Sequence, residues 1–133
     1  MNKNPTNADE QYKLGFCYFK GDGIPKDTQK GFYWFTKAAE QGHAGAQFYL
    51  GNFYLGGINI QKDEKKGVFW ITKAAEQGHA DAQFYLGSFY DNGDGVPKDR
   101  NKAEYWYAKS AEQGNENAKE TMAKLASLKK RGL

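Results

Sequence analysis

Apolar residues recur along this chain at helical spacing, and each apolar segment is followed by a polar, glycine-rich stretch. In the first segment Leu14, Cys17 and Tyr18 are three and four residues apart, which places them on one face of a helix. The stretch 21–26 reads Gly-Asp-Gly-Ile-Pro-Lys. It ends the helix, because glycine adopts unusual backbone angles and proline cannot continue a helix. A second apolar segment follows at 31–39, so the pattern predicts helix, loop, helix.

This helix–loop–helix pattern occurs three times with a fixed step of 36 residues, as between Gly15 and Gly51. The tryptophans repeat with the same step and without gaps, at Trp34, Trp70 and Trp106. A period of this length indicates a solenoid, in which each unit buries its apolar face against its neighbours. We expect a single all-α repeat domain over residues 1–133, with repeats at 8–43, 44–79 and 80–115 and a capping helix at 116–130.

The helix ends are marked by residues with strong positional preferences. Asp27 or Thr28 is the expected N-cap of the second helix, and Gly42 the expected left-handed residue after it. The same reasoning gives the other helices, which are expected at 8–20, 44–55, 64–77, 80–92 and 100–113.

Small residues inside the helices predict close helix packing. Gly15 lies mid-helix, like its copies at 51 and 87, where glycine costs about 1 kcal/mol relative to alanine. Helix contact at the near end of the usual range of about 8–10 Å is the expected compensation. Trp34 and its copies are expected to fill the space between helices. Cys17 stands where Phe53 and Phe89 stand, so we expect it in the core.

Composition and charge narrow the function only a little. Hydrophobic residues make up 39% and charged residues 26% of the chain, and the net charge is +3. This mild charge indicates neither a nucleic-acid nor a membrane partner, and no run of about 20 apolar residues is present. A single cysteine, Cys17, permits no intrachain disulfide. We expect a cytoplasmic protein, unless a leader was removed before Met1.

Candidate chemistry is sparse. His43 and His79 hold equivalent positions in consecutive turns, and two such histidines do not supply the three or four converging ligands of a metal site. The run 91–95, Asp-Asn-Gly-Asp-Gly, lacks the spaced ligands and distal Glu of a calcium loop. Two turn histidines also give no arrangement for nucleophilic catalysis. We therefore expect no metal, no cofactor and no catalytic residue.

The third repeat carries a recognisable string of residues. It reads Ala-Asp-Ala-Gln-Phe-Tyr-Leu-Gly-Ser-Phe-Tyr at 80–90, Gly-Asp-Gly-Val-Pro-Lys-Asp at 93–99, and Lys-Ala-Glu-Tyr-Trp-Tyr-Ala-Lys-Ser-Ala-Glu-Gln-Gly at 102–114. This string resembles the Sel-one-like repeat (SLR) family, and the resemblance extends over about residues 8–125. It implies a right-handed α/α superhelix related to tetratricopeptide repeats, with the first helices lining a concave groove.

The resemblance also implies a class of function. Members of the family are mainly adaptors and scaffolds in protein–protein interaction, and some bacterial members are immunity proteins that neutralise a toxin. A cysteine-rich branch has been linked to β-lactam binding, but this chain lacks its paired cysteines. We expect a non-enzymatic module that binds a protein or peptide in the groove, with a toxin-immunity protein as its narrower form. The alternatives are an enzyme acting on β-lactam or cell-wall substrates, and a repeat fragment without independent function.

To identify the face that lines the groove, we assign Leu14 and Tyr18, with their copies in the other repeats, to the core face of each first helix. The opposite face then holds the candidate partner-binding residues: Tyr12, Phe16, Phe19, Phe48, Asn52, Leu55, Phe84, Ser88 and Asp91. Phe48 and Phe84 could instead pack between repeats, whereas we expect partner contact from Phe16, Phe19 and Leu55, which break the repeat identity. We expect a monomer, with self-association through the uncapped N-terminal end as an alternative.

Overall fold

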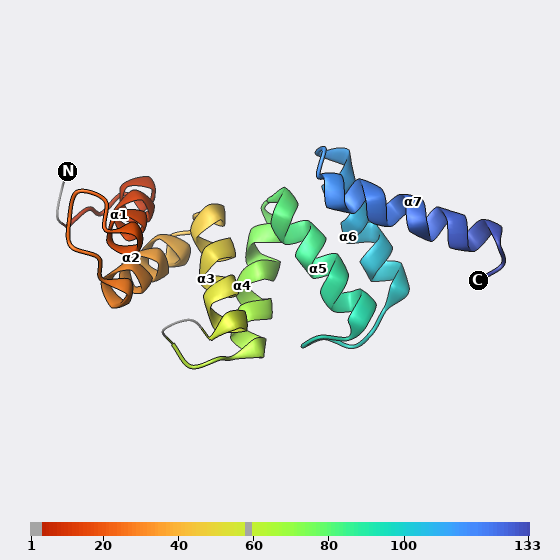
Figure 1. The fold of residues 1–133 in the computed structure, drawn as a ribbon, viewed down its shortest axis with the longest axis horizontal. Helices are drawn as coiled ribbons and strands as arrows, with labels where there is room; N and C mark the ends of the chain where they lie inside the picture. Colours follow the sequence, from red (N-terminus) through yellow and green to blue (C-terminus); the bar gives the residue numbers. More distant parts are fainter. Residues whose placement is uncertain (1–3, 58–59) are drawn as a thin grey trace. The chain divides into compact units, whose positions relative to one another are not determined.

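The computed structural model describes residues 4–57 and 60–133, and over these ranges the chain forms seven α-helices and no β-strand (Figure 1). The predicted helix ranges agree with the structure to within one residue at either end. The helices are α1 (Ala8–Lys20), α2 (Thr28–Glu40), α3 (Ala44–Gly56), α4 (Glu64–Glu76), α5 (Ala80–Asn92), α6 (Arg100–Glu112) and α7 (Glu116–Lys130).

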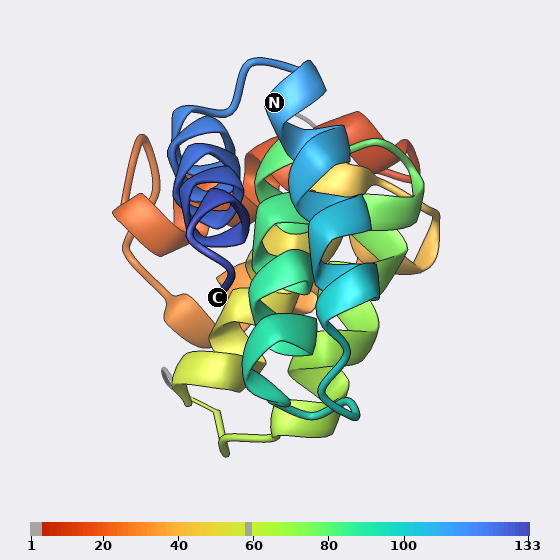
Figure 2. The ribbon, with the colours of Figure 1, turned by 90° about the vertical axis from the view of Figure 1, so that its right-hand side faces the viewer.

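The helices belong to two compact units, Met1–Ala74 and Ala75–Leu133, and the boundary between the units falls inside α4. In the first unit α1 packs against α2, and α2 packs against α3. In the second unit α5 packs against α6, and α6 packs against the last helix, α7. Helices α5 and α6 lie side by side in both views (Figures 1 and 2).

Side chains at repeated positions determine where the helices begin. Before α3, Nδ1 of His43 accepts the backbone N–H of Ala46 at 3.0 Å, and His79 accepts that of Ala82 at 3.1 Å before α5. Before α2, the Asp27 carboxylate accepts the N–H of Lys30 at 3.1 Å, which confirms Asp27 as the cap. The remaining N-caps are Asn7, Asp63, Asp99 and Asn115. The turn histidines are therefore helix caps that stand at the joints between repeats.

Glycines in the paired helices bring the two backbones together, as predicted. A Cβ added at Gly15 would lie 3.2 Å from the carbonyl oxygen of Gly31, and one added at Gly31 would lie 3.1 Å from that of Gly15. The second repeat is tighter, since a Cβ at Gly51 or Gly67 would lie 3.0 Å from the carbonyl oxygen of the other. No side chain fits between these helices without movement.

The tryptophan position is half-buried, and Trp70 packs against the buried cluster of α2 and α3, in line with the prediction that tryptophan fills space between helices. Trp34 is half-buried, whereas the next residue, Phe35, is 1% exposed and faces Gly15. The equivalent buried residues of the other repeats are Ile71 and Tyr107. Successive residues on a helix point about 100° apart, so only one of two adjacent apolar residues faces the core.

Cys17 is also half-buried, which corrects its assignment to the core. Its counterpart Phe53 is buried because Phe19 and Phe32 of the preceding repeat pack against it, with the Phe19 ring stacked at 4.8 Å. Among the described residues no helix precedes α1, so Cys17 lacks such neighbours.

Buried glutamines tie each first helix to the chain before it. The side-chain Nε2 of Gln47 donates to the carbonyl oxygen of Ala39 at 3.1 Å, and that of Gln83 donates to Ala75 at 3.2 Å. At the start of the chain the same position, Gln11, donates to the Pro5 carbonyl at 3.0 Å. These bonds satisfy polar groups that burial would otherwise penalise.

Candidate binding surface

Aromatic side chains of the first helices gather on one face of the first unit. Tyr12 and Phe16 on α1 are half-buried and meet edge to face, with ring centroids 4.9 Å apart. Phe16 meets Tyr49 of α3 in the same way at 5.0 Å, and Phe48 meets Tyr49 at 5.7 Å. Tyr12 also stacks on the His43 imidazole at 4.3 Å. This aromatic cluster (Tyr12, Phe16, Phe48, Tyr49) joins three of the predicted residues and leaves their rings partly open to solvent.

Burial changes the ionisation of one member of the cluster. It raises the pKa of the Tyr12 phenol, and the nearby Tyr49 raises this pKa further. The Tyr12 phenol therefore stays a neutral donor and acceptor of hydrogen bonds around neutral pH. A partner would meet an uncharged, amphipathic surface at this point.

Phe19 and Leu55 lie elsewhere than predicted, since the structure places both side chains between paired helices. A Cβ at Gly31 would lie 2.8 Å from Cδ2 of Phe19, and one at Gly67 would lie 2.6 Å from Cγ of Leu55. The glycines of the second helices thus make room for these side chains. Packing accounts for both residues, and their contact with a partner stays an untested prediction.

In the second unit the predicted positions are more polar and are bonded to one another. The Tyr107 hydroxyl donates to Asp91 Oδ2 at 3.4 Å and accepts a hydrogen bond from the Ser88 hydroxyl at 3.3 Å. Arg100 Nε donates to Asp91 Oδ1 at 3.0 Å. Burial is the main cause that raises the pKa of Tyr107, and its hydrogen bond to Ser88 opposes the shift. Asp91 is therefore held by bonds within the helix pair, and its contact with a partner stays an untested prediction.

The two other predicted residues have contacts within their own units. Phe84 lies 5.7 Å from the ring of Tyr107 of the same repeat, so it packs inside the second unit, and the choice between packing against another repeat and contacting a partner stays untested. Its neighbour Tyr85 is 36% exposed. In the first unit, Nδ2 of Asn52 donates to the carbonyl oxygen of Phe48 at 3.0 Å. The most open aromatic ring on this face of α5 is thus Tyr85, the repeat counterpart of Tyr49.

The second helices expose a set of aromatic residues that the sequence reasoning did not single out. Tyr33 is 51%, Phe69 51% and Tyr105 55% exposed, and the three occupy the same repeat position. Each ring meets the following tryptophan edge to face, with centroids 5.1 Å apart in every repeat. The signal was present in the sequence, because a large aromatic residue precedes tryptophan in all three repeats.

Beside these rings lie two equivalent depressions, each contained within one unit. The first, of about 320 Å³, is lined by Ala39, Glu40, Gly42, Gln47, Phe69, Trp70 and Lys73. The second, of about 360 Å³, has the corresponding lining of Ala75, Glu76, Gln77, Gly78, Gln83, Tyr105, Trp106 and Lys109. We call them the repeat niches. Both combine aromatic rings with one lysine and one glutamate.

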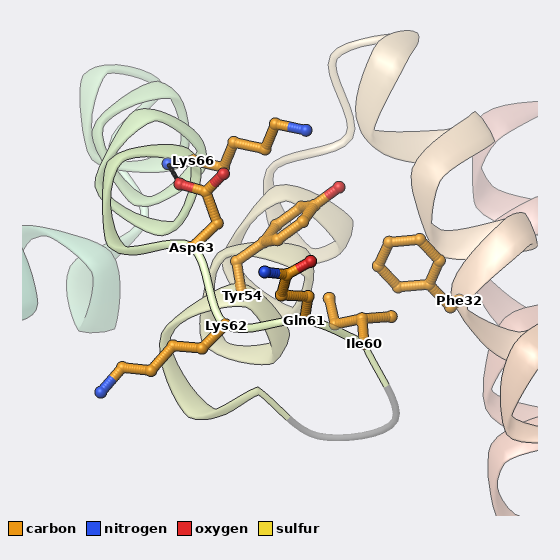
Figure 3. A pocket seen from close by; sticks show the side chains of 7 residues that line it. All are labelled: Phe32, Tyr54, Ile60, Gln61, Lys62, Asp63 and Lys66. Carbon is orange, nitrogen blue, oxygen red and sulfur yellow. Dashed lines mark hydrogen bonds between the residues drawn. The ribbon is translucent and has the colours of Figure 1, made fainter.

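A further depression of about 330 Å³ lies where α2 approaches the loop before α4 (Figure 3). Phe32, Tyr54 and Ile60 form its apolar side, and the Lys66 ammonium lies 5.5 Å from the Tyr54 ring centroid. The Asp63 carboxylate at its edge accepts the backbone N–H of Lys66 (Figure 3). The charged groups of Asp63 and Lys66 are therefore engaged in the local fold.

The described residues contain no group of three or more His, Cys, Asp or Glu side chains that could hold a metal ion. His43 and His79 use Nδ1 as helix caps, and Nε2 of His43 lies 3.0 Å from the Asp9 carboxylate. No helix among the described residues has the length and apolar character to cross a membrane.

Comparison with known proteins gives a consistent result. The family model described as Sel1 repeat matches residues 11–43, 44–79 and 80–115. A crystal structure of a Sel1 repeat protein from Oxalobacter formigenes is 39% identical, with a TM-score of 0.87, and the match covers 90% of both chains. No curated protein sequence is a significant match.

Two other solved structures are similar. A protective antigen of uropathogenic Escherichia coli with an SLR fold is 38% identical, with a TM-score of 0.83, and the match covers 95% of this chain but only 26% of the antigen. The cysteine-rich protein B of Helicobacter pylori is 26% identical, with a TM-score of 0.71, and the match covers 84% of this chain and 86% of that protein. These likenesses show an all-α repeat solenoid fold.

Proposed function

Because the chain belongs to the Sel1 repeat family, whose repeats mediate protein–protein interaction, we propose that it is a non-enzymatic module that binds a protein or peptide through its first helices. The observation that supports this proposal is the aromatic cluster of α1 and α3. Its rings are half-buried and touch one another, so little side-chain entropy is lost when a partner covers them. Clustered aromatic residues of this kind are frequent hot spots of interfaces.

The packing in the structure favours a smaller set of contact residues for this proposal than the sequence analysis gave. Phe19, Leu55 and Asp91 are taken up by packing or hydrogen bonds inside the helix pairs. Tyr12, Phe16, Phe48 and Tyr49 remain for the first unit, with Tyr85 as the open aromatic residue of the second.

Charge near the cluster indicates which partner side chains it favours. Lys20 lies with its ammonium 5.4 Å from the centroid of the Phe16 ring, and Lys13 is exposed on the same helix. Positions 13, 16 and 20 share one helix face, because they are three, four and seven residues apart. A partner segment with an apolar side chain next to a carboxylate fits this surface. The apolar side chain would pack on the Phe16 ring, and the carboxylate would pair with Lys13 or Lys20.

Two double variants of matched chemistry test the proposal. The first-helix variant is Tyr49→Ala/Tyr85→Ala, and the second-helix variant is Tyr33→Ala/Tyr105→Ala, so each loses two tyrosine rings. A partner would be captured from a lysate of the source organism with the wild-type chain, identified, purified and titrated against all three proteins by calorimetry. Circular dichroism and melting curves would confirm that each variant folds.

We expect the first-helix variant to bind the purified partner at least about tenfold more weakly, which corresponds to about 1.4 kcal/mol. The second-helix variant should bind like the wild type. The reverse result would contradict the assignment to the first helices. The narrower function, neutralisation of a toxin, requires that the captured partner is a toxin whose activity the chain inhibits.

A further inference from the structure

The exposed aromatic residues of the second helices belong to a larger repeated pattern. In each helix the aromatic residue is followed by a lysine four residues later and a glutamate seven residues later, all on one face of the helix. We call each set a rung, and the rungs are Tyr33–Lys37–Glu40, Phe69–Lys73–Glu76 and Tyr105–Lys109–Glu112. Their three rings are more than half exposed, so each second helix presents a large aromatic side chain to solvent at the same repeat position.

The charges of the rungs form no ion pair with one another or with other side chains of the described chain. The three lysines lie over their own aromatic rings, with the ammonium 5.3–5.5 Å from the ring centroid. Within the described ranges no ion pair of 4.0 Å or less includes a rung lysine or a rung glutamate. A lysine that precedes a glutamate on a helix is also in the less favourable order for a pair within that helix. Both signs of charge are therefore left for an outside contact.

The rung is complementary to itself when two copies run antiparallel. If Lys37 of one copy faces Glu40 of the other, the two-fold axis makes the reverse pair form as well, because an isologous interface uses each contact twice. In this register Tyr33 lies beyond the C-terminal end of α2 of the other copy, beside the turn that follows Glu40. The first repeat niche lies there, lined by Gly42 and Gln47. In the second repeat Phe69 likewise lies beside the turn that follows Glu76, where the niche is lined by Gly78 and Gln83.

We propose that the second helices are a self-association surface, through which two copies of the chain dock with their rungs antiparallel. The rung lysines of one copy pair with the rung glutamates of the other. The exposed rings sit in the repeat niches, whose volumes of about 320 and 360 Å³ are in the range of pockets that hold small ligands. Because the rungs share one pattern, any rung of one copy can face any rung of the other.

The same charges argue against other occupants. A polyanion would meet a glutamate beside every rung lysine, and a strongly basic partner would meet a lysine beside every glutamate. A second copy presents both signs at the matching spacing. Few side chains take part at each rung, so the complex belongs to the weak class of interfaces, with dissociation expected between about 10 µM and about 1 mM.

Sedimentation equilibrium of the full chain with two charge variants tests this proposal. The acidic variant is Lys37→Glu/Lys73→Glu/Lys109→Glu, and the basic variant is Glu40→Lys/Glu76→Lys/Glu112→Lys. All six positions are on the surface of helices, so we expect both variants to fold, and circular dichroism would verify this. The wild type should rise from its monomer mass of 15.0 kDa towards twice that mass as its concentration increases.

Each variant alone should remain a monomer, because its rungs carry one sign of charge only. An equal mixture of the two should associate one to one, since their rungs are then complementary. Restored association in the mixture is a result that a purely structural role of these side chains would not produce. A wild type that stays at 15.0 kDa up to about 1 mM overturns the proposal. Variants that each associate like the wild type also overturn it, because the contact would then lie elsewhere, such as at the N-terminal end.

Discussion

Replacing Gly51 by alanine is the most direct test of the close helix approach in the second repeat. The new methyl group would lie 2.8 Å from Cγ1 and 2.9 Å from Cδ1 of Ile71, and 3.0 Å from the carbonyl oxygen of Gly67. Alanine gains about 1 kcal/mol of helix propensity over glycine, and overpacking costs about 1–3 kcal/mol. We therefore expect a loss of about 0–2 kcal/mol in the free energy of unfolding. Leucine at this position adds bulk to the same contacts and should cost about 1–3 kcal/mol or more.

A double-mutant cycle separates the free-energy cost of the steric clash with Ile71 from the gain in helix propensity. The variant Ile71→Ala removes both carbon atoms that the new methyl group would strike, at its own cavity cost of about 2–5 kcal/mol. In that background only the Gly67 carbonyl opposes the methyl group, so Gly51→Ala should be less harmful by about 1 kcal/mol. Urea unfolding of the four proteins, followed by circular dichroism, gives the four free energies.

Equal effects of Gly51→Ala in the two backgrounds would refute this reasoning, because the cost could not then come from contact with Ile71. Gly15→Ala serves as a graded control in the first repeat. Its methyl group would lie 3.1 Å from Cδ1 of Phe35 and 3.2 Å from the Gly31 carbonyl oxygen. These contacts are looser, so the variant should be less destabilised than Gly51→Ala.

Three further predictions concern hydrogen bonds of the fold and the protonation of His79. Asp99→Ala removes the N-cap of α6 and should lower the free energy of unfolding by about 1 kcal/mol, whereas Asp99→Asn should lose little; equal losses would contradict the capping role. Gln83→Leu should cost about 0.5–1.5 kcal/mol in urea unfolding, because the Gln113 side chain and the Ala75 carbonyl each lose one hydrogen bond but keep another to Gly78. Burial lowers the pKa of His79 in the fold, so the unfolded chain takes up the proton first. Stability should therefore fall as the pH drops below the unfolded pKa of about 6.5. Urea midpoints of His79→Asn should show a smaller dependence on pH, and an unchanged slope would contradict the assignment.

The sequence predicted the helices well because their ends depend on local signals. Capping residues such as Asp27 act within a few residues, and the fixed 36-residue step carries each assignment to the next repeat, so one sequence displays both signals. The rotation of each helix was harder to predict. Choosing Tyr18 for the core face placed Phe19 on the open side, but Tyr18 is half-buried and Phe19 packs against Gly31. The helix is turned so that the face of Gln11, Leu14 and Gly15 is innermost.

The binding surface was less predictable than the helices, for two physical reasons. Adjacent apolar residues such as Trp34 and Phe35 give the same periodic signal, and only the packed structure shows which one faces inward. Because Phe35 faces inward, Tyr33, which is two residues earlier on the helix, faces solvent. Buried Gln11 was missed because a polar side chain looks solvated until its partner, the Pro5 carbonyl, is known.

The glutamine bonds have a consequence for how such a chain can change its length. The Nε2 of Gln113 donates to the carbonyl of Gly78 at 2.7 Å, and that of Gln41 donates to Thr6 at 2.8 Å, 35 residues back in both cases. The residues before α1 are thus bonded to the first repeat by the same glutamine side-chain hydrogen bonds that connect two consecutive repeats. Duplication or deletion of one 36-residue segment leaves every such bond with a donor and an acceptor. Gene duplication could therefore lengthen this protein by whole repeats without a compensating mutation at the new joint.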